Sequence, residues 1–514
     1  MTITWTDIPD PDVIRVGDTY YMTSTTMYFI PGCPIMKSKD LVDWEMIGYV
    51  YDVISDTDKM TLSGGQNDYG SGTWASSLRY HDGVYYVAVC ANSMNETYIF
   101  HTTDIEKGKW ERHVIEGIYH DMSLLFDDGR VFMVYGFSAI RIVELTSDCK
   151  KIKQGGLSKV IIENADISGG NFLAEGSHIY KIGRYYYIFI ICWPKTGSGR
   201  RIQVCYRADA VDGVYEGKVV LDDSIGFRNA GVAQGGIVDT PDGKWFGLLF
   251  QDHGAVGRIP VCLPMKWEDG WPAFDSSGPK KFSSLAKIIS GDDFDSTDVS
   301  SVWQWNHNPD HRYWSLGTRP GWLRLTTGSI CTSIYDAKNT LTQRTFGPKC
   351  SGIVCIDVSG IKDGDMCGLA ALQDDCGYVG VTMDGGKRSI VAAAYPNLNC
   401  EDECGLTKPS PDCYKNIRVF CSKKGIKPII LESVPLDNNT VFLRLDFDFA
   451  TDTKDTDEAM FYYSLCGKDW RRIGKNLNLI YKLTHFTGYR FALFNFATKF
   501  SGGYADFDCF QTKG

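Results

Sequence analysis

The sequence has no apolar run long enough to cross a lipid bilayer and no excess of positive charge. No stretch approaches the roughly 20 apolar residues that span a bilayer as a helix. The chain carries 53 Lys and Arg against 63 Asp and Glu, a formal net charge of -10. Nucleic acid and anionic membranes are therefore poor candidates for partners, because both attract basic surfaces. No cleavable leader with charged, apolar and small-residue segments is visible, so we expect a cytoplasmic protein.

A disulfide framework and a zinc-binding cysteine pattern are also missing. The 17 cysteines are odd in number, and their spacing matches neither arrangement. Cys90, Cys192 and Cys205 lie inside apolar, strand-like runs, where reduced cysteine behaves as a small hydrophobe. We therefore expect free thiols in a reducing compartment. The sequence likewise shows no phosphate-binding glycine loop, nucleotide fingerprint or catalytic metal cluster.

What the sequence has in abundance is aromatic side chains and length. Aromatic residues make up 13% of the chain, including 28 Tyr and 26 Phe, which favours β-structure. Aromatic rings also pack well on the apolar C–H faces of sugars, although most of these rings are expected simply to fill a core. A chain of 514 residues exceeds what one hydrophobic core usually organises, so we expect at least two domains.

One local pattern recurs five times in the first half of the chain: an apolar strand, a tight turn containing glycine, and an aromatic strand. The turn glycines are Gly17, Gly83, Gly129, Gly183 and Gly243. Glycine supplies the positive φ that such hairpin turns require. The separations of 66, 46, 54 and 60 residues each fit one four-stranded blade, so the repeat predicts a five-bladed β-propeller.

The second half of the chain has short alternating strands without the blade repeat. They are expected at residues 321–327, 352–358, 440–449 and 491–496. Many short strands and few helical stretches are typical of a β-sandwich. The sequence therefore predicts an all-β protein with a propeller catalytic domain at 1–288 and a jelly-roll-like sandwich accessory domain at 289–514.

Three carboxylates occupy nearly the same position in three of the five repeats. Asp10 lies 7 residues before its turn glycine, and Asp121 and Glu175 each lie 8 before theirs. Trp74 and Gln234 lie 9 before the corresponding glycines of the other two repeats. Because the first strand of every blade lines the central channel, we expect these five side chains to meet at one mouth of the channel.

A group of carboxylates in a partly desolvated funnel provides the pair that glycoside hydrolysis needs. Like charges raise one another's pKa, so a neutral acid can coexist with an ionised base. The acid protonates the leaving oxygen. The ionised carboxylate either activates the attacking water or attacks in place of water. Asp12 competes with Asp10 for the base role, because strand alternation places both on one face.

Four segments resemble glycoside hydrolase family 43 in the same order along the chain. They are PDPDVIRVGDTYYMTST (9–25), DMSLLFDDGR (121–130), AEGSHIYKIGRYYY (174–187) and GRIPV…WEDGWP (257–272). The resemblance implies an inverting mechanism with Asp10 as general base and Glu175 as general acid. It also implies that Asp121 tunes the pKa of the acid and orients it.

The same resemblance suggests residues around the acids. It implies that Phe29 and Trp74 wall the sugar site, and that Arg258 hydrogen-bonds sugar hydroxyls and restrains the neighbouring carboxylates. Members of the family frequently place a His on the propeller axis, where it holds calcium or water. Here Gln234 takes that position, and His253 is the nearby imidazole expected as a substitute ligand for Ca²⁺. Such an ion would be structural, because no cofactor is expected for the chemistry.

The function expected from these features is exo-hydrolysis of short arabinoxylan-derived oligosaccharides. We expect release of terminal L-arabinofuranose, with β-D-xylosidase activity as the alternative or as a second activity. The sandwich resembles the C-terminal domain of family xylosidases and arabinofuranosidases, and we expect it to buttress the propeller. A non-catalytic carbohydrate-binding propeller and a retaining, fructan-cleaving or transferase relative are the competing hypotheses. The sequence leaves the oligomeric state open.

Overall fold

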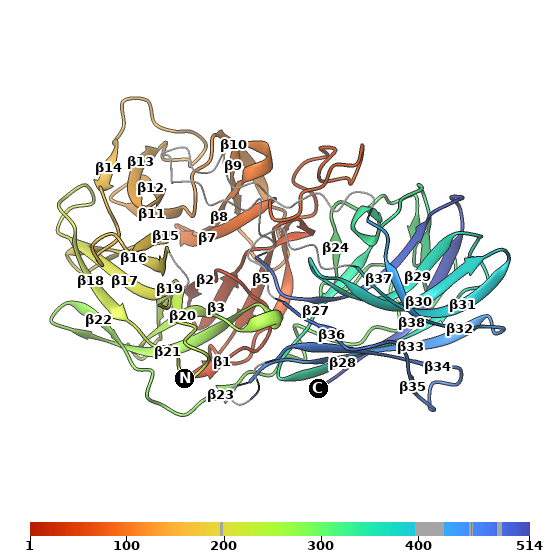
Figure 1. Cartoon of the computed structure of the whole chain (residues 1–514). Helices are drawn as coiled ribbons and strands as arrows, with labels where there is room; N and C mark the ends of the chain where they lie inside the picture. Colours follow the sequence, from red (N-terminus) through yellow and green to blue (C-terminus); the bar gives the residue numbers. More distant parts are fainter. Residues whose placement is uncertain (196–198, 396–425, 452–453, 455, 481–485) are drawn as a thin grey trace.

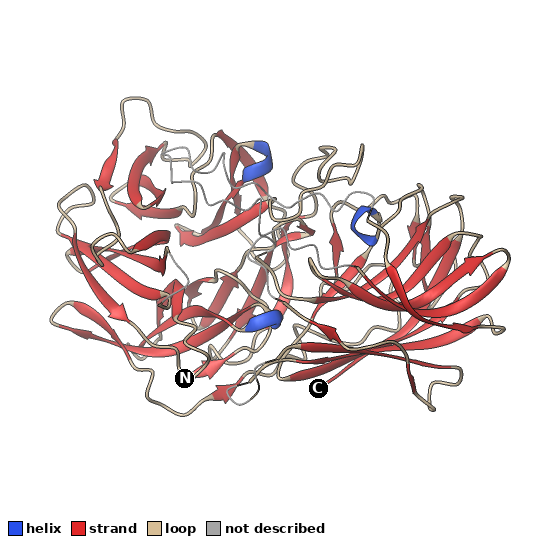
Figure 2. Cartoon of the chain, viewed as in Figure 1, coloured by secondary structure: helices blue, strands red, loops and turns tan. Residues whose placement is uncertain are grey.

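The computed structural model describes residues 1–514 except 196–198, 396–425, 452–453, 455 and 481–485. The described residues are almost entirely strands and loops, as Figure 2 shows. Their helices are three short 3₁₀ turns at Asn92–Met94, Gly254–Val256 and Ile334–Asp336. No helix in this part of the chain is long and apolar enough to cross a membrane.

The N-terminal half forms a five-bladed β-propeller, drawn in red to green at the left of Figure 1. Blade 1 contains β2 (Asp12–Val16), β3 (Thr19–Thr23), β5 (Gly32–Ser38) and β6 (Glu45–Tyr51), and blade 2 contains β7 (Thr73–His81), β8 (Val84–Ala91), β9 (Glu96–Thr102) and β10 (Glu111–Glu116). Blade 3 contains β11 (Ser123–Asp127), β12 (Arg130–Phe137), β13 (Ala139–Leu145) and β14 (Ser158–Ile162). Blade 4 contains β15 (Phe172–Ile182), β16 (Tyr185–Pro194), β17 (Ile202–Ala208) and β18 (Glu216–Leu221). Blade 5 contains β19 (Val232–Asp239), β20 (Trp245–Asp252), β21 (Arg258–Glu268) and β22 (Trp271–Phe274).

The five predicted turn glycines all lie between the first and second strands of a blade. Their φ angles run from 60° at Gly183 to 82° at Gly83. A Cβ at any of them would meet no atom within 4 Å, so the turn conformation and not crowding is what requires glycine there. The repeat thus located every blade correctly.

The inner strands of the blades form a closed ring around the channel. Each of β2, β7, β11, β15 and β19 contacts the next, and β19 contacts β2 again. The N-terminal strand β1 (Thr2–Ile3) pairs with β21 of the last blade and with β23 (Lys281–Phe282). The beginning of the chain is therefore built into the fifth blade, which joins the two ends of the propeller.

The C-terminal half is a sandwich of two sheets, shown in green to blue at the right of Figure 1. In order, one sheet contains β32 (Ile429–Pro435), β31 (Lys387–Ala394), β30 (Gly377–Asp384), β29 (Asp365–Leu372), β37 (Arg490–Ala497), β27 (Leu341–Arg344), β24 (Gln304–Asn306) and β4 (Phe29–Ile30). The other contains β25 (Trp314–Ser315), β26 (Leu323–Thr326), β38 (Tyr504–Lys513), β28 (Lys349–Asp357), β33 (Thr440–Asp448), β34 (Glu458–Ser464) and β35 (Arg471–Arg472), with β36 (Leu477–Asn478) paired to β34. The four strands expected from the sequence are all present, and the prediction of a β-sandwich is confirmed.

The two domains share a sheet and a buried polar contact. Strand β4 leaves the propeller and pairs with β24, with Ile30 opposite Trp305. Asp7, near the N-terminus, accepts hydrogen bonds from the backbone N–H of Arg258 in the propeller and of Gly488 in the sandwich, both at 2.9 Å. Paired strands and buried polar contacts of this kind fix the sandwich firmly against the propeller. The boundary at residue 288 stays a prediction.

The cysteines of the described residues are free thiols, and most are buried. Cys90, Cys192 and Cys205 pack in the propeller core, as expected from their apolar neighbours. Burial raises the pKa of the Cys192 thiol to about 12, so it stays protonated. These side chains fill space in the core, as small hydrophobes do.

Candidate active site

Backbone geometry brings the three repeat-phased carboxylates to one end of the channel. Asp10 and Asp121 each lie two residues before an inner strand, β2 and β11, and both have positive φ, 50° and 46°. Glu175 lies within inner strand β15 at a β-bulge. Left-handed residues and bulges are costly features that re-aim side chains, and they concentrate at functional sites.

Asp10 is held by two short hydrogen bonds. Its Oδ1 accepts from Nη1 of Arg258 at 2.6 Å, and its Oδ2 accepts from the Thr25 hydroxyl at 2.6 Å. The side chains of Asp10 and Arg258 are only 8% and 7% exposed. Charge-assisted bonds of this length in a buried setting fix the orientation of the carboxylate.

His120 links the other two carboxylates. Its Nε2 lies 3.1 Å from Oε2 of Glu175 and 3.5 Å from Oδ2 of Asp121. The second oxygen of Glu175, Oε1, accepts a hydrogen bond from the indole N–H of Trp193 at 3.1 Å. Both oxygens of Glu175 are therefore positioned by side chains that the sequence analysis did not select.

The pKa values of this cluster are pushed in opposite directions. Burial raises the pKa of Asp121 to about 7, and the charges of Glu175 and Asp10 add to this effect while His120 opposes it. Burial also raises the pKa of Glu175, but the His120 hydrogen bond and the positive charges of His120, Arg258 and Arg201 lower it below its ordinary value. In the free protein, Asp121 therefore holds a proton more readily than Glu175.

Replacing Asp121 with asparagine is expected to stabilise the protein more at pH 8 than at pH 5. The folded-state pKa of Asp121 is raised, so its contribution to stability is fully present below the unfolded value near 3.8 and is lost as pH rises through about 7. Asparagine removes the buried charge that is present at pH 8. Since one pKa unit corresponds to ~1.4 kcal/mol and the stability is lost progressively between pH 3.8 and about 7, we expect the gain in unfolding free energy at pH 8 to exceed that at pH 5 by ~1–3 kcal/mol. Calorimetric melting at both pH values measures it, and an equal shift at pH 5 and pH 8 would contradict the assignment.

Asp12, the alternative to Asp10, is committed to a structural network deeper in the channel. Its Oδ2 accepts from Arg79 Nη1 at 2.7 Å and from the Leu78 N–H at 2.8 Å, and its Oδ1 lies 3.2 Å from His178 Nδ1. The side chain of Asp12 is fully buried. With both oxygens occupied, Asp12 is a poor candidate for activating water.

Arg79 connects the inner strands of several blades across the channel. Besides Asp12 of blade 1, its guanidinium donates to the Leu124 carbonyl and the Ser123 hydroxyl of blade 3, at 2.8 and 2.6 Å. It also donates to the Ile179 carbonyl of blade 4 at 3.4 Å. A cation thus already occupies this level of the channel and neutralises the carboxylate there.

The two residues suggested for an axial calcium ion do not fit that role. The His253 ring stacks on Phe227 with centroids 3.4 Å apart and meets Trp5 edge-on at 5.0 Å. Calcium prefers several oxygen ligands, whereas His253 offers a nitrogen ligand and is buried in an aromatic setting. The backbone N–H of Gln234 is held by the Gln203 side chain at 2.7 Å, and its own side chain packs over Gly176 beside Glu175. Gln234 therefore lies at the carboxylate site, and His253 is a core residue.

Trp74 and Arg258 lie beside the carboxylates, together with a ring from the sandwich. Trp74 meets His120 edge-on with centroids 5.2 Å apart and contacts Phe486 at 5.7 Å. The guanidinium of Arg258 lies 5.5 Å from the Phe486 ring. Phe486 reaches this point because Gly488, two residues later, is hydrogen-bonded to Asp7 at the domain interface.

Phe29, in contrast, is buried at the junction of the two domains. It is 1% exposed, it forms strand β4, and its ring is covered by the Arg490 guanidinium at 3.6 Å. The structure therefore places Phe29 behind the site, where it supports the interface, instead of on an open sugar-facing wall.

The sequence analysis missed several side chains at the site, among them His120, Trp193 and Phe486. His120 immediately precedes Asp121, so its position next to a selected carboxylate was the available signal. Trp193 on β16 lies opposite Leu173 on β15, close to Glu175. This register becomes visible only once the two strands are paired. Phe486 belongs to the other domain, and nothing in its local sequence indicates where it packs.

Comparison with known proteins agrees with this geometry. The model of glycosyl hydrolases family 43 matches residues 2–272, and the beta xylosidase C-terminal concanavalin A-like domain matches residues 291–414 and 403–513. A beta-xylosidase of Formosa agariphila is 27% identical over 98% of this chain and 88% of its own length. A non-reducing end alpha-L-arabinofuranosidase of Bacteroides ovatus is 27% identical over 71% of this chain and 72% of its own.

A solved structure shows the same two-domain arrangement. It is a bifunctional GH43-CE protein of Bacteroides eggerthii, 44% identical to this chain, with a TM-score of 0.88. The alignment covers 99% of this chain but 63% of that one, so this chain spans less than two thirds of that relative. The family model covers more than half of the sequence, and the three carboxylates of this chain converge at one site. The chain therefore belongs to glycosyl hydrolases family 43.

Proposed function

We propose that the protein is an inverting, exo-acting glycoside hydrolase that releases terminal α-L-arabinofuranose from short arabinoxylan-derived oligosaccharides. The observation that carries the proposal is the convergence of Asp10, Asp121 and Glu175 at one channel mouth, with Arg258 and His120 between them. A propeller that only bound sugar would gain nothing from like charges held together in a buried site, so the convergence favours catalysis over a binding module.

In the proposed reaction Asp10 is the general base. Arg258 and Thr25 hold its carboxylate in a fixed orientation, so that it can take a proton from the water that attacks the anomeric carbon. Glu175 protonates the glycosidic oxygen as the bond breaks. A single displacement requires the two carboxyl groups to be ~6.5–9.5 Å apart, whereas a retaining enzyme holds them at ~5–5.5 Å.

His120 supplies the proton that Glu175 needs in this mechanism. The pKa of Glu175 is lowered in the free site, while that of His120 is raised, because the carboxylates Asp121, Glu175 and Asp10 outweigh the effect of burial on the imidazole. A bound sugar excludes water from Glu175, which favours the neutral carboxylic acid. The imidazolium then passes its Nε2 proton across the 3.1 Å contact to Oε2, leaving neutral His120 and an acid ready to protonate the leaving group.

The walls of the site support an exo-acting mode of hydrolysis. Trp74 and the sandwich ring Phe486 lie against each other beside the carboxylates, and Arg258 lies between Asp10 and Phe486. Rings from two domains beside the carboxylates would obstruct a polymer that runs across the channel mouth, which supports binding of a terminal sugar. The substrate partner proposed here is therefore a small oligosaccharide, and a cytoplasmic location would suit imported oligosaccharides of this size.

β-D-xylosidase activity is the second candidate. It is favoured by the beta-xylosidase name of the Formosa agariphila relative, which aligns with 98% of this chain, whereas the arabinofuranosidase of Bacteroides ovatus aligns with 71%. The two terminal sugars present similar hydroxyl geometry at the scissile bond, so one pocket can accept both.

Hydrolysis of paired nitrophenyl glycosides tests the proposal. Nitrophenyl α-L-arabinofuranoside and β-D-xylopyranoside are compared with arabinoxylan oligosaccharides, and NMR identifies the first-formed anomer. We expect higher kcat/KM on the arabinofuranoside and an inverted product. Higher kcat/KM on the xyloside would select the second candidate, a retained anomer would overturn the mechanism, and binding without turnover would favour a carbohydrate-binding role.

A further inference from the structure

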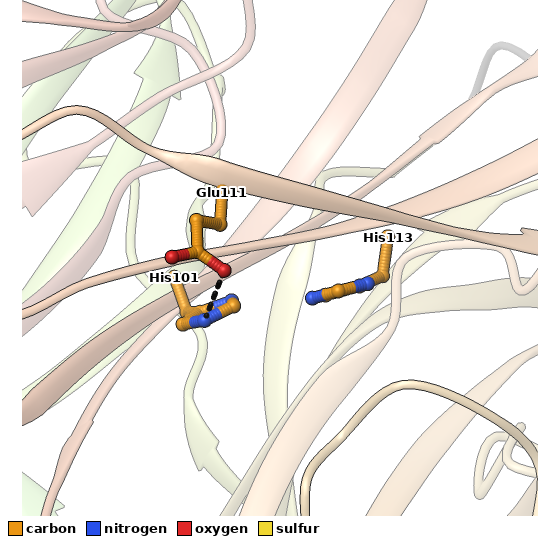
Figure 3. Close-up of side chains that lie close together, drawn as sticks. All are labelled: His101, Glu111 and His113. Carbon is orange, nitrogen blue, oxygen red and sulfur yellow. Dashed lines mark ion pairs between the residues drawn. The ribbon is translucent and has the colours of Figure 1, made fainter.

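A second group of ionisable side chains lies on the outer edge of blade 2, away from the carboxylate site. His101 is on β9, and Glu111 and His113 are on β10, the outermost strand of the blade. Glu111 is directly opposite His101 in the antiparallel pair, and His113 lies two residues further along β10. Because side chains two residues apart point to the same face of a strand, all three share one face, as Figure 3 shows.

The donor atoms of the three side chains are close enough to bind one ion. One donor atom from each residue lies within 4.8 Å of the other two. His101 Nε2 is 3.3 Å from Glu111 Oε2, and the two imidazole rings are nearly parallel with centroids 5.2 Å apart. Nε2 of His113 is buried and has no hydrogen-bond partner among the residues that the structure describes. A buried nitrogen without a partner is uncommon and calls for a ligand.

We propose that His101, Glu111 and His113 form a binding site for a divalent transition-metal ion, with Zn²⁺ as the best match. Two imidazoles and one carboxylate are ligands that zinc uses, with water completing a tetrahedron, whereas Ca²⁺ and Mg²⁺ prefer oxygen ligands. The site rests on this geometry and on nothing that the glycosidase reaction requires.

The surroundings of the imidazoles suit metal binding. The Tyr86 ring stacks on His101 with centroids 6.1 Å apart, and the His101 ring in turn lies nearly parallel to that of His113.

A bound ion would tie together two neighbouring strands at the rim of the propeller. His101 and Glu111 lie on different strands, so one ion coordinated by both resists separation of β10 from β9. The proposed catalytic carboxylates lie on or next to the inner strands, so metal binding at the rim is expected to raise thermal stability and to leave hydrolysis unchanged.

Titration of the chelator-treated, full-length protein with Zn²⁺ tests the proposal, with isothermal calorimetry for affinity and thermal melting for stability. We expect one equivalent bound at this site, a rise in the melting temperature, and at least a tenfold loss of affinity in His113→Asn and in Glu111→Gln. Glu111 is largely exposed, so its variant is expected to fold even if the His113 variant does not. The control is Asp508→Asn with Cys509→Ser, which disrupts a separate cluster of the described residues, Asp293, Asp508 and Cys509, and should still bind one equivalent of Zn²⁺. Unchanged Zn²⁺ affinity in both blade 2 variants, or no binding by the wild type, would overturn the proposal, as would binding lost only in Glu175→Gln.

Discussion

Replacing Glu175 with glutamine is expected to lower kcat on arabinoxylan oligosaccharides by about 10²–10⁴-fold, the range in which general acid catalysis contributes. Glutamine matches glutamate in shape and can still accept from Trp193 through its amide oxygen. It cannot deliver a proton to the glycosidic oxygen, so the sugar must depart as an alkoxide, which is a poor leaving group. Initial rates of oligosaccharide hydrolysis, followed by product chromatography, measure the loss.

Two comparisons make this result specific to acid catalysis. Nitrophenyl glycosides carry a good leaving group that needs little protonation, so Glu175→Gln should affect them far less than oligosaccharides. Glu144→Gln is the matched control, because Glu144 is buried but pairs with Arg130 and Lys153 on blade 3, away from the site. It should reduce stability and leave kcat unchanged. Equal losses of kcat on both substrate types would instead indicate that Glu175 supports the structure of the site.

The propeller could be predicted from the sequence because its signals are local. The first hairpin of each blade contains a glycine that adopts positive φ, such as Gly83 or Gly129. This turn depends only on the few residues around it, so the sequence reveals it directly. Since equivalent strands face the channel, the spacing from those glycines also placed Asp10, Asp121 and Glu175 together. Periodicity and turn chemistry suffice where a fold is built from one repeated unit.

The rest of the site depends on contacts between distant segments. Phe29 and Phe486 show this most clearly, since one lies behind the site and the other beside it. Phe29 is covered by Arg490 of the sandwich, and Phe486 is positioned through the contact of Gly488 with Asp7. Both outcomes follow from how the domains dock, which neither local sequence encodes.

The protonation of the site is a collective property that spacing alone does not predict. Crowding of like charges was expected to keep an acid neutral, and in the free site the raised pKa belongs to Asp121, with that of Glu175 lowered by His120, Arg258 and Arg201. Burial raises the pKa of Asp121, whereas His120 is the first of the groups that lower the pKa of Glu175. His120 is not part of the repeat-phase argument.

Replacing Asp10 with asparagine is expected to lower kcat by about 10²–10⁴-fold on oligosaccharides and on activated nitrophenyl glycosides alike. Both substrates need a base to activate water, so a better leaving group does not compensate for its loss. The amide keeps the size of the side chain and can still accept from Arg258 through its oxygen. Kinetics on both substrate types, with circular dichroism to confirm the fold, measure the effect.

Asp12→Asn separates the two aspartates that the sequence alone left in competition. Asp12 is fully buried and paired with Arg79, and breaking a buried pair by removing one partner costs ~3–5 kcal/mol, so this variant should be less stable. Sodium azide discriminates further, because an external anion that needs no deprotonation can replace the water. It should restore turnover of the activated glycoside by Asp10→Asn and give the glycosyl azide of inverted configuration. If azide rescues Asp12→Asn instead, Asp12 is the base, and an azide product of retained configuration from Asp10→Asn would show that the reaction does not proceed by single displacement.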